Sequence, residues 1–374
     1  MTISKISLYF ISIISLSIRL QAQVFDDKEL QDRLWDCAFH IYNSERDSSF
    51  LKLAKVEREI PNHPAIPLMK AMAILWSSIP IISNDDFQRF ESFLRKAIEF
   101  AELNEKDMTD PEMVFFAMGA HGLLAEYYAD KGWYLKAAGE ANEAYALIKK
   151  GFVFVEQHKE FLLTTGLYNY FREKYPEQYP IYKPLLWFFR DGNKEKGLQQ
   201  LVEAANESLF IEVEANVYLS YIFLRYEFKP KKAQEYLLDL CERYPGNLYA
   251  KAKYLESIAN PEDFSKASLS ELNELANNTS PYYQLAGYTF LGYRAEVMEE
   301  NHFEAERLYT RALKKGEEIP DHGKFFKSFA HLGLGRVLVE KDISRAKNSL
   351  RKAVRYAETD QVKQESLELL SNID

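Results

Sequence analysis

The chain has 374 residues, of which 47% are hydrophobic and 14% aromatic, with only 15 glycines and 13 prolines. This composition is typical of a folded protein and leaves little room for disordered linkers. The formal charge of −9 becomes −11 without the first 23 residues, which hold Lys5 and Arg19 and no acid. Such acidity argues against a nucleic-acid partner, whose phosphates need a basic face.

The first 22 residues have the pattern of a secretory signal peptide. Lys5 precedes an apolar run over residues 6–18, and a polar stretch follows that ends in Gln21, Ala22 and Gln23. The run is too short to span a bilayer comfortably, which takes about 20 residues. We therefore expect cleavage after Ala22, with a retained anchor as the alternative. The mature chain is then periplasmic, associated with the outer membrane, or secreted.

The mature chain keeps two cysteines, Cys37 and Cys241. A disulfide requires their α carbons to lie within about 7 Å, and an extended array of repeats holds them apart. We expect both to be buried free thiols, because free cysteine behaves as a small hydrophobic residue.

The sequence has helical periodicity from about Lys28 to the end. Within it, a pattern of small and large residues recurs with a longer period. Four segments begin 36 residues apart, and in each the first, fifth and eighth positions share one face of a helix. These positions are Gly197, Leu201 and Ala204; Ala233, Leu237 and Leu240; Leu269, Asn273 and Ala276; and Ala305, Tyr309 and Ala312. Small residues at the ends of the stripe allow a second helix to approach closely. Asn273 departs from the rule, and we expect Leu272 beside it to take its place.

Related stripes extend the pattern toward both ends of the chain. They comprise Ala137, Ala141 and Ala144; Ala346, Leu350 and Ala353; and, more loosely, Phe90, Leu94 and Ala97, and Leu51 and Ala54. Pro245 and Pro281 each follow a stripe by five residues. A proline there cannot continue a helix and marks the turn to the next unit.

The pattern resembles the tetratricopeptide repeat (TPR), a helix-turn-helix unit with small and aromatic residues at such offsets. The resemblance covers most of the mature chain in roughly seven units. It implies an all-α fold, a right-handed TPR-like α-solenoid over residues 23–374. The step of 36 exceeds the usual 34 of the family, which implies slightly longer turns or helices. An ordinary helical bundle with alanine-rich faces is the alternative.

The register of the repeats breaks between Ala144 and Ala204. These equivalent positions lie 60 residues apart, which is one repeat plus 24 residues. We interpret the surplus as an insertion at about residues 150–180. It adds a helix that ends at Pro176, since residues before a proline avoid the helical region.

A narrower resemblance concerns the same part of the chain. The stretches GLYNYFREKYPEQYP and PLLWFFRDGNKEKGLQQL, after an N-terminal IYNSERDSSFLKLAKVEREIPNHP, are similar to the tetratricopeptide repeat 39 family and its bacterial relatives. They span less than a third of the chain and contain no catalytic motif. This resemblance supports the assignment of the repeats and implies nothing further about a secreted protein.

Stacked helical pairs present a concave surface lined by the first helix of each unit, and such surfaces bind extended peptides or partner helices. Counting back from the stripes places Tyr221 and Tyr293 at one equivalent inner position. With their neighbours they form a set of candidate binding residues of types that contribute strongly at interfaces. The set is Tyr218, Tyr221, Arg225, Tyr293 and Arg294. The alternative role of these aromatic residues is packing between helices.

The aromatic stretch over residues 166–189 offers a second candidate surface. Tyr179 and Tyr182 flank prolines, where the backbone is least regular, so they are the first candidates for exposed contacts. We expect Trp187, Phe188 and Phe189 to lie in the core.

The sequence contains no pattern typical of an enzyme. Its seven histidines form no two-histidine pair on one helical turn, and neither cysteine has a metal-ligand neighbour at close spacing. No glycine-rich loop for phosphates occurs. We therefore expect a non-enzymatic protein with neither a cofactor nor a metal.

Three hypotheses follow for function. The first is an exported scaffold that binds a protein or peptide, with an envelope or outer-membrane complex as its setting. The second is an envelope module that binds glycans or nutrients through the aromatic insertion. The third is an enzyme whose site is assembled across repeats, and the sequence favours the first.

Overall fold

The computed structural model describes residues 23–178, 180, 187 and 189–373, and this described chain is all-helical. The first half holds α1 Lys28–Tyr42, α2 Arg46–Val56, α3 Ala65–Ser78, α4 Asn84–Asn104, α5 Pro111–Asp130, α6 Tyr134–Phe154, the short 3-10 helix η1 Lys159–Phe161, α7 Leu162–Gln178 and α8 Lys194–Glu207. The second half holds α9 Glu212–Arg225, α10 Pro230–Arg243, α11 Leu248–Ser257, the 3-10 helix η3 Phe264–Lys266, α12 Leu269–Ala276, α13 Pro281–Val297, α14 His302–Glu317, α15 Lys324–Leu338, α16 Ile343–Tyr356 and α17 Asp360–Ile373.

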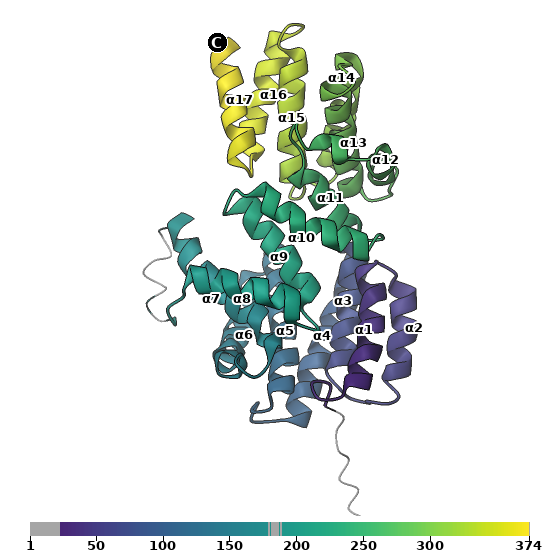
Figure 1. Cartoon of the computed structure of the whole chain (residues 1–374), viewed down its shortest axis with the longest axis vertical. Helices are drawn as coiled ribbons and strands as arrows, with labels where there is room; N and C mark the ends of the chain where they lie inside the picture. The colour runs from purple at the N-terminus through teal and green to yellow at the C-terminus, as the bar shows by residue number, and fades with distance from the viewer. Residues whose placement is uncertain (1–22, 179, 181–186, 188, 374) are drawn as a thin grey trace, which may run out of the picture.

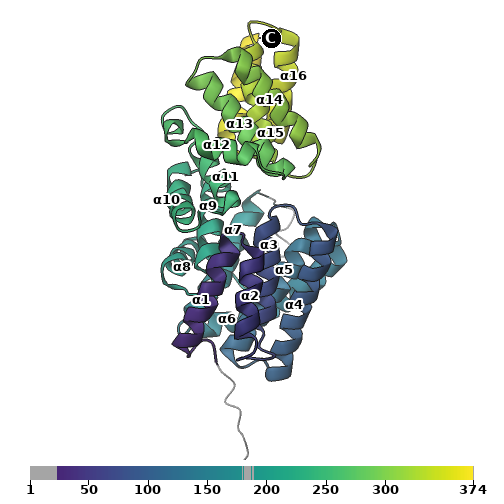
Figure 2. The same ribbon diagram turned by 90° about the vertical axis from the view of Figure 1, so that its right-hand side faces the viewer.

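Each helix packs chiefly on the helices before and after it in the chain, so the protein is a run of helical hairpins. Helices α1–α6 form one end of the molecule and α11–α17 the other, with α7–α10 between them (Figures 1 and 2). The expected all-α class is confirmed. The packing of consecutive helices is consistent with an α-solenoid.

The helices begin where the sequence supplies capping residues. At the start of α12, Ser268 Oγ accepts from the Glu271 N–H at 3.2 Å, and the Glu271 carboxylate accepts from the Ser268 N–H at 3.0 Å. This reciprocal capping box satisfies two N–H groups that have no partner within the helix. Asp110 caps α5 ahead of Pro111, and Pro281 begins α13. The predicted helix boundary at Pro281 is therefore confirmed.

The stripes of small and large residues are buried in most of the helices for which they were predicted. The buried members are Phe90, Leu94 and Ala97 in α4; Ala137 and Ala144 in α6; Gly197, Leu201 and Ala204 in α8; Ala233, Leu237 and Leu240 in α10; Ala276 in α12; Ala305, Tyr309 and Ala312 in α14; and Ala346, Leu350 and Ala353 in α16. In α12 Asn273 is exposed and Leu272 is fully buried, as expected. The prediction is wrong for Leu51, Ala141 and Leu269, which are exposed. Leu51 lies opposite the buried face of α2, which centres on Leu53, and Ala141 lies at the edge of the buried face of α6.

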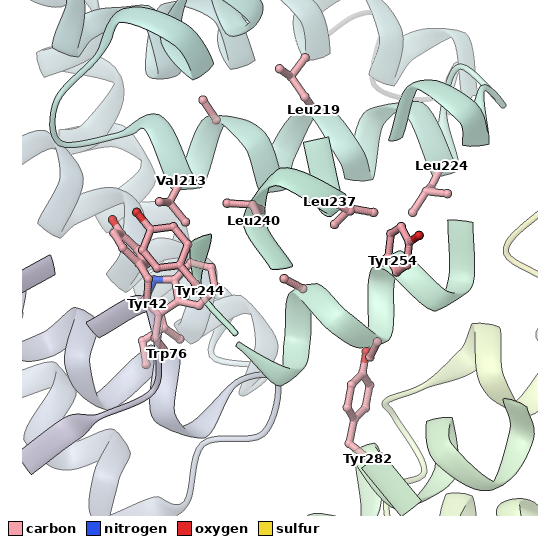
Figure 3. Packing of buried hydrophobic residues seen from close by; sticks show 14 of the residues in the cluster. Tyr42, Trp76, Val213, Leu219, Leu224, Leu237, Leu240, Tyr244, Tyr254 and Tyr282 are labelled. Atoms are coloured by element: carbon pink, nitrogen blue, oxygen red, sulfur yellow. The ribbon is translucent and has the colours of Figure 1, made fainter. Parts of the chain in front are cut away.

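Small residues in the stripes mark places where two helix backbones touch. A Cβ added to Gly197 of α8 would lie 2.5 Å from the backbone nitrogen of Tyr170 in α7. One added to Gly287 of α13 would lie 2.2 Å from the backbone nitrogen of Ala276 in α12. Larger buried side chains fill the space beside such contacts, and Figure 3 shows Leu224 of α9 on the same side as Leu237 and Leu240 of α10, with Leu219 on the opposite side of α9. Close packing of this kind leaves no room for a methyl group.

The segment that follows the predicted cleavage position is part of the core. The buried carboxylate of Glu112 in α5 accepts from the N–H groups of Val24 at 2.9 Å and Phe25 at 2.8 Å, and it lies 2.6 Å from His63 Nε2. The Phe25 ring packs 5.6 Å from that of Phe115, centroid to centroid. These contacts satisfy two backbone donors that burial would otherwise leave without partners.

The insertion differs from its prediction in two respects. Helix α7 continues to Gln178, so it does not end at Pro176. Pro176 lies in the last turn, is buried, and supplies no backbone N–H to the helix there. Trp187 was expected in the core, but its side chain is 88% exposed, and that of Phe189 is 42% exposed. Phe188 lies outside the described residues.

Both cysteines are free thiols, as expected. Cys37 is buried in α1 and Cys241 is partly buried in α10. Burial raises the pKa of Cys37 to about 11 and that of Cys241 to about 12. Both therefore stay protonated and unreactive at neutral pH. Among the described helices, none is long and apolar enough to cross a bilayer.

The backbone contact at Gly197 generates a stability prediction. We expect Gly197→Ala to lower the free energy of unfolding by about 1–3 kcal/mol, because α7 and α8 must separate to admit the methyl group. Urea denaturation followed by circular dichroism measures this difference.

The matched control is Gly139→Ala in α6, where an added Cβ meets no atom within 4 Å. We expect it to be neutral or stabilising by up to about 1 kcal/mol, since alanine favours the helix. Equal losses for the two variants would show that the α7–α8 contact does not limit stability.

Candidate functional site

Three of the sequence-predicted binding residues lie together on α9. Tyr218, Tyr221 and Arg225 follow one another at helical spacing along the face of α9 that looks toward α5 and α11. Tyr221 is 41% exposed, while Tyr218 is partly buried. The Tyr218 hydroxyl donates to the Glu126 carboxylate of α5 at 3.4 Å. The contact joins residues 92 positions apart in the sequence.

The other predicted residues do not join this group. Tyr293 of α13 is only 3% exposed, and its ring packs 4.8 Å from that of Phe264 and 5.0 Å from that of Phe329. Tyr293 is equivalent to Tyr221 in the repeat, but neighbouring helices cover it on both sides. Arg294 pairs with Glu299 at 3.0 Å near the C-terminal end of α13. Tyr179 and Tyr182 lie outside the described residues.

Around Tyr218 the structure gathers further tyrosines that sequence reasoning missed. They come from α5, α11 and α13, and their phenols lie close enough to influence one another electrostatically. We call this set the tyrosine junction, which comprises Tyr127, Tyr218, Tyr249, Tyr282 and Tyr283. Burial, together with the neighbouring phenol of Tyr249, raises the pKa of Tyr127, Tyr282 and Tyr283. Figure 3 shows Tyr282 standing on α13 with its hydroxyl directed toward α11.

The junction joins parts of the chain that are far apart in sequence. The Tyr283 hydroxyl donates to the backbone carbonyl of Ile79, at the end of α3, at 2.7 Å. These two residues are 204 positions apart. The junction therefore lies where the N-terminal helices meet α13.

Two carboxylates of α5 border the junction. Glu126 and Asp130 are one helical turn apart, and both are exposed to solvent. Desolvation by the surrounding helices nevertheless raises the pKa of both carboxyls, and the charge of Asp130 raises the pKa of Glu126 further. The charges of His322 and Lys131 act in the opposite direction on Asp130. These side chains reach water but lack the full hydration that a convex surface gives.

The cations on the opposite side are neutralised within the protein. Arg225 is 9% exposed and pairs with Glu256 of α11 and, at 3.4 Å, with Glu358 after α16. Its guanidinium lies 5.5 Å from the centroid of the Phe325 ring. Lys253 pairs with Glu256 at 3.0 Å. Although burial opposes it, the two cations lower the pKa of the Glu256 carboxyl. Through these ion pairs Arg225 connects α9 to α11 and to the C-terminal part of the chain.

A further carboxylate, Glu214, lies one turn before Tyr218 on α9. It accepts from the Tyr42 hydroxyl of α1 at 2.9 Å, and the Trp76 indole is a second partner. Burial raises the pKa of Glu214 to about 7, and the charge of Glu212 contributes in the same direction. The electrostatic influence of Glu214 reaches Tyr218 and Tyr244. The α1–α9 contact therefore contains a group that titrates near neutral pH.

Two other regions do not form a comparable site. A shallow hollow on α4 is lined by Gln88, Glu91, Ser92, Arg95, Lys96 and Glu99. Its alternating charges are typical of a solvated helix face. In the described part of the chain, no three histidine, cysteine, aspartate or glutamate side chains are grouped as metal ligands.

No known family model matches this chain, and no curated protein is significantly similar to it. The assignment of function therefore depends on the geometry of the tyrosine junction.

The raised pKa of Glu214 predicts a specific pH dependence of stability. The pKa of Glu214 rises from 4.5 to about 7 on folding, so its protonated carboxyl stabilises the folded protein. This contribution is complete below pH 4.5 and is lost as the pH rises through 7. Glutamine does not ionise, so Glu214→Gln does not lose this stability. We expect the free energy of unfolding of the variant, relative to that of the wild type, to increase between pH 4.5 and pH 8 by at most about 3 kcal/mol. Chemical denaturation across this range measures the difference.

The control is Glu235→Gln, which changes an exposed carboxylate on α10. We expect its profile to follow that of the wild type. If the Glu214→Gln and wild-type profiles stay parallel, Glu214 does not ionise near neutral pH in the folded protein.

Proposed function

We propose that this protein is a non-enzymatic scaffold that binds a protein or peptide partner at the tyrosine junction. Its helices are taken to form a right-handed, TPR-like α-solenoid over residues 23–374, with the junction on the inner face. Residues 1–22 are taken to be a signal peptide, so that the scaffold acts in the periplasm, at the outer membrane or outside the cell.

One observation carries this proposal. Tyrosines from four helices converge on a surface that also holds solvent-exposed carboxylates and the exposed Tyr221. Tyrosine supplies a large contact area and a hydrogen-bonding hydroxyl at low cost in conformational entropy. A surface built from helices far apart in sequence is also rigid, which lowers the entropic cost of binding.

The exposed side chains of the aromatic stretch over residues 166–189 support a second candidate, the binding of glycans. Trp187 is 88% exposed and Tyr175 is 42% exposed. Flat aromatic rings of this kind can stack on sugar rings.

The proposal predicts that Tyr221 contributes to peptide binding. Peptides are selected from a random display library on the protein comprising residues 23–374, and their affinities are measured by fluorescence anisotropy. We expect Tyr221→Ala to weaken the selected peptides by about tenfold, a loss typical of a tyrosine at an interface. The unfolding temperature should change little, because Tyr221 is exposed.

The control is Tyr134→Ala, which removes a tyrosine that is 73% exposed on α6, away from the junction. A library that yields no binder, or peptides that bind both variants with wild-type affinity, would reject the scaffold. Retention on an oligosaccharide array that is lost in Trp187→Ala would favour the glycan-binding candidate instead.

A further inference from the structure

The charges at the tyrosine junction are unevenly compensated. Arg225 and Lys253 already pair with protein carboxylates. Glu126 and Asp130, in contrast, form no ion pair with any residue that the structure describes. The sole hydrogen bond to their carboxylates from the described chain is the 3.4 Å contact from Tyr218. The uncompensated charge at the junction is therefore negative.

A phenol beside these carboxylates also has unused hydrogen-bonding capacity. Tyr127 follows Glu126 in α5, and its side chain is only 9% exposed. The charges of Glu126 and Asp130 act on its phenol, but its hydroxyl has no hydrogen-bond partner among the described residues, whereas the Tyr218 hydroxyl donates to Glu126. A largely buried phenol normally finds a partner. The Tyr127 hydroxyl therefore favours a ligand that can hydrogen-bond to it beside Glu126.

The chemistry of these groups selects among ligand classes. An anion would meet the repulsion of Glu126 and Asp130, and Arg225 and Lys253 are already paired with Glu256 and Glu358. An apolar group would leave Asp130 and the Tyr127 hydroxyl without partners. An ammonium or guanidinium group would pair with the carboxylates, donate to the phenol oxygens and lie against aromatic rings, which attract cations.

We infer that the tyrosine junction binds a basic segment of the partner, with a lysine or arginine side chain seated between Glu126 and Asp130 of α5 and the phenols of Tyr127 and Tyr218. This inference rests on the proposed function, because it names the class of peptide that the scaffold takes. The partner is a protein or peptide with clustered positive charge. The surrounding helices already remove part of the hydration of the two carboxylates. An ion pair with the cation therefore costs less desolvation here than on the outer faces of the helices.

The test compares two double variants with the same change in net charge. Fluorescein-labelled octalysine is titrated with the protein comprising residues 23–374, and anisotropy gives the dissociation constant. We expect Glu126→Gln with Asp130→Asn to weaken binding about tenfold or more, as the loss of charge-assisted bonds at a partly desolvated site does.

The matched control is Glu235→Gln with Asp239→Asn. These residues are also an exposed glutamate and an exposed aspartate one turn apart, but they lie on α10, outside the junction, where Asp239 pairs with Arg243 at 2.6 Å. We expect less than a twofold change, because charges outside the junction act only through the screened net charge. The single variant Asp130→Asn should show an intermediate loss, and unfolding temperatures near that of the wild type show that each variant is folded.

Each outcome bears on the inference. Equal losses in the two double variants, or octalysine affinity unchanged by Glu126→Gln with Asp130→Asn, would overturn it by showing that the cation does not bind at the junction. If library peptides that depend on Tyr221 prove neutral or acidic, the scaffold stands and the basic ligand is rejected. If no peptide depends on Tyr221, the scaffold itself fails.

Discussion

The structure depends on the close approach of consecutive helix backbones. At Gly197 and Gly287 there is no space for even a methyl group, so the axes of the paired helices are fixed by contact of backbone with backbone. A larger residue at the centre of each stripe, such as Leu201 or Tyr309, then fills the space beside the contact. Because each hairpin packs mainly on its neighbours, small errors of orientation would accumulate along the chain. Tight contacts at regular intervals limit that accumulation.

Long-range polar ties supplement this local packing. Tyr42 with Glu214, and Tyr283 with the carbonyl of Ile79, connect helices separated by 172 and 204 positions in the sequence. Arg225 connects α9 to Glu256 and to the C-terminal part of the chain. A stack held only by neighbouring contacts could bend, whereas these ties hold the N-terminal helices against α9, α11 and α13. The surface between them is therefore held by contacts from several distant parts of the chain.

The sequence predicted the part of the structure that depends on local periodicity. Ala233, Leu237 and Leu240 are buried as expected because a fixed step in sequence places them on one face of α10. Periodicity does not specify what covers an equivalent residue from outside its own unit. Tyr221 and Tyr293 occupy equivalent positions, yet Phe264 and Phe329 bury only Tyr293. The tyrosine junction could not be predicted for the same reason, since contacts such as that of Tyr218 with Glu126 join distant units.

Such a junction has electrostatic properties that a convex surface does not. Glu126 is exposed, yet helices on several sides remove part of its hydration and raise the pKa of its carboxyl. An exposed carboxylate on an outer helix keeps its water and gains little from an ion pair, because two well-hydrated charges must be ordered to form it. At the junction that hydration is already reduced when the protein folds. Part of the desolvation cost of the carboxylate is therefore met during folding. A cation that binds there offsets a smaller desolvation cost than a cation that binds on the outer surface.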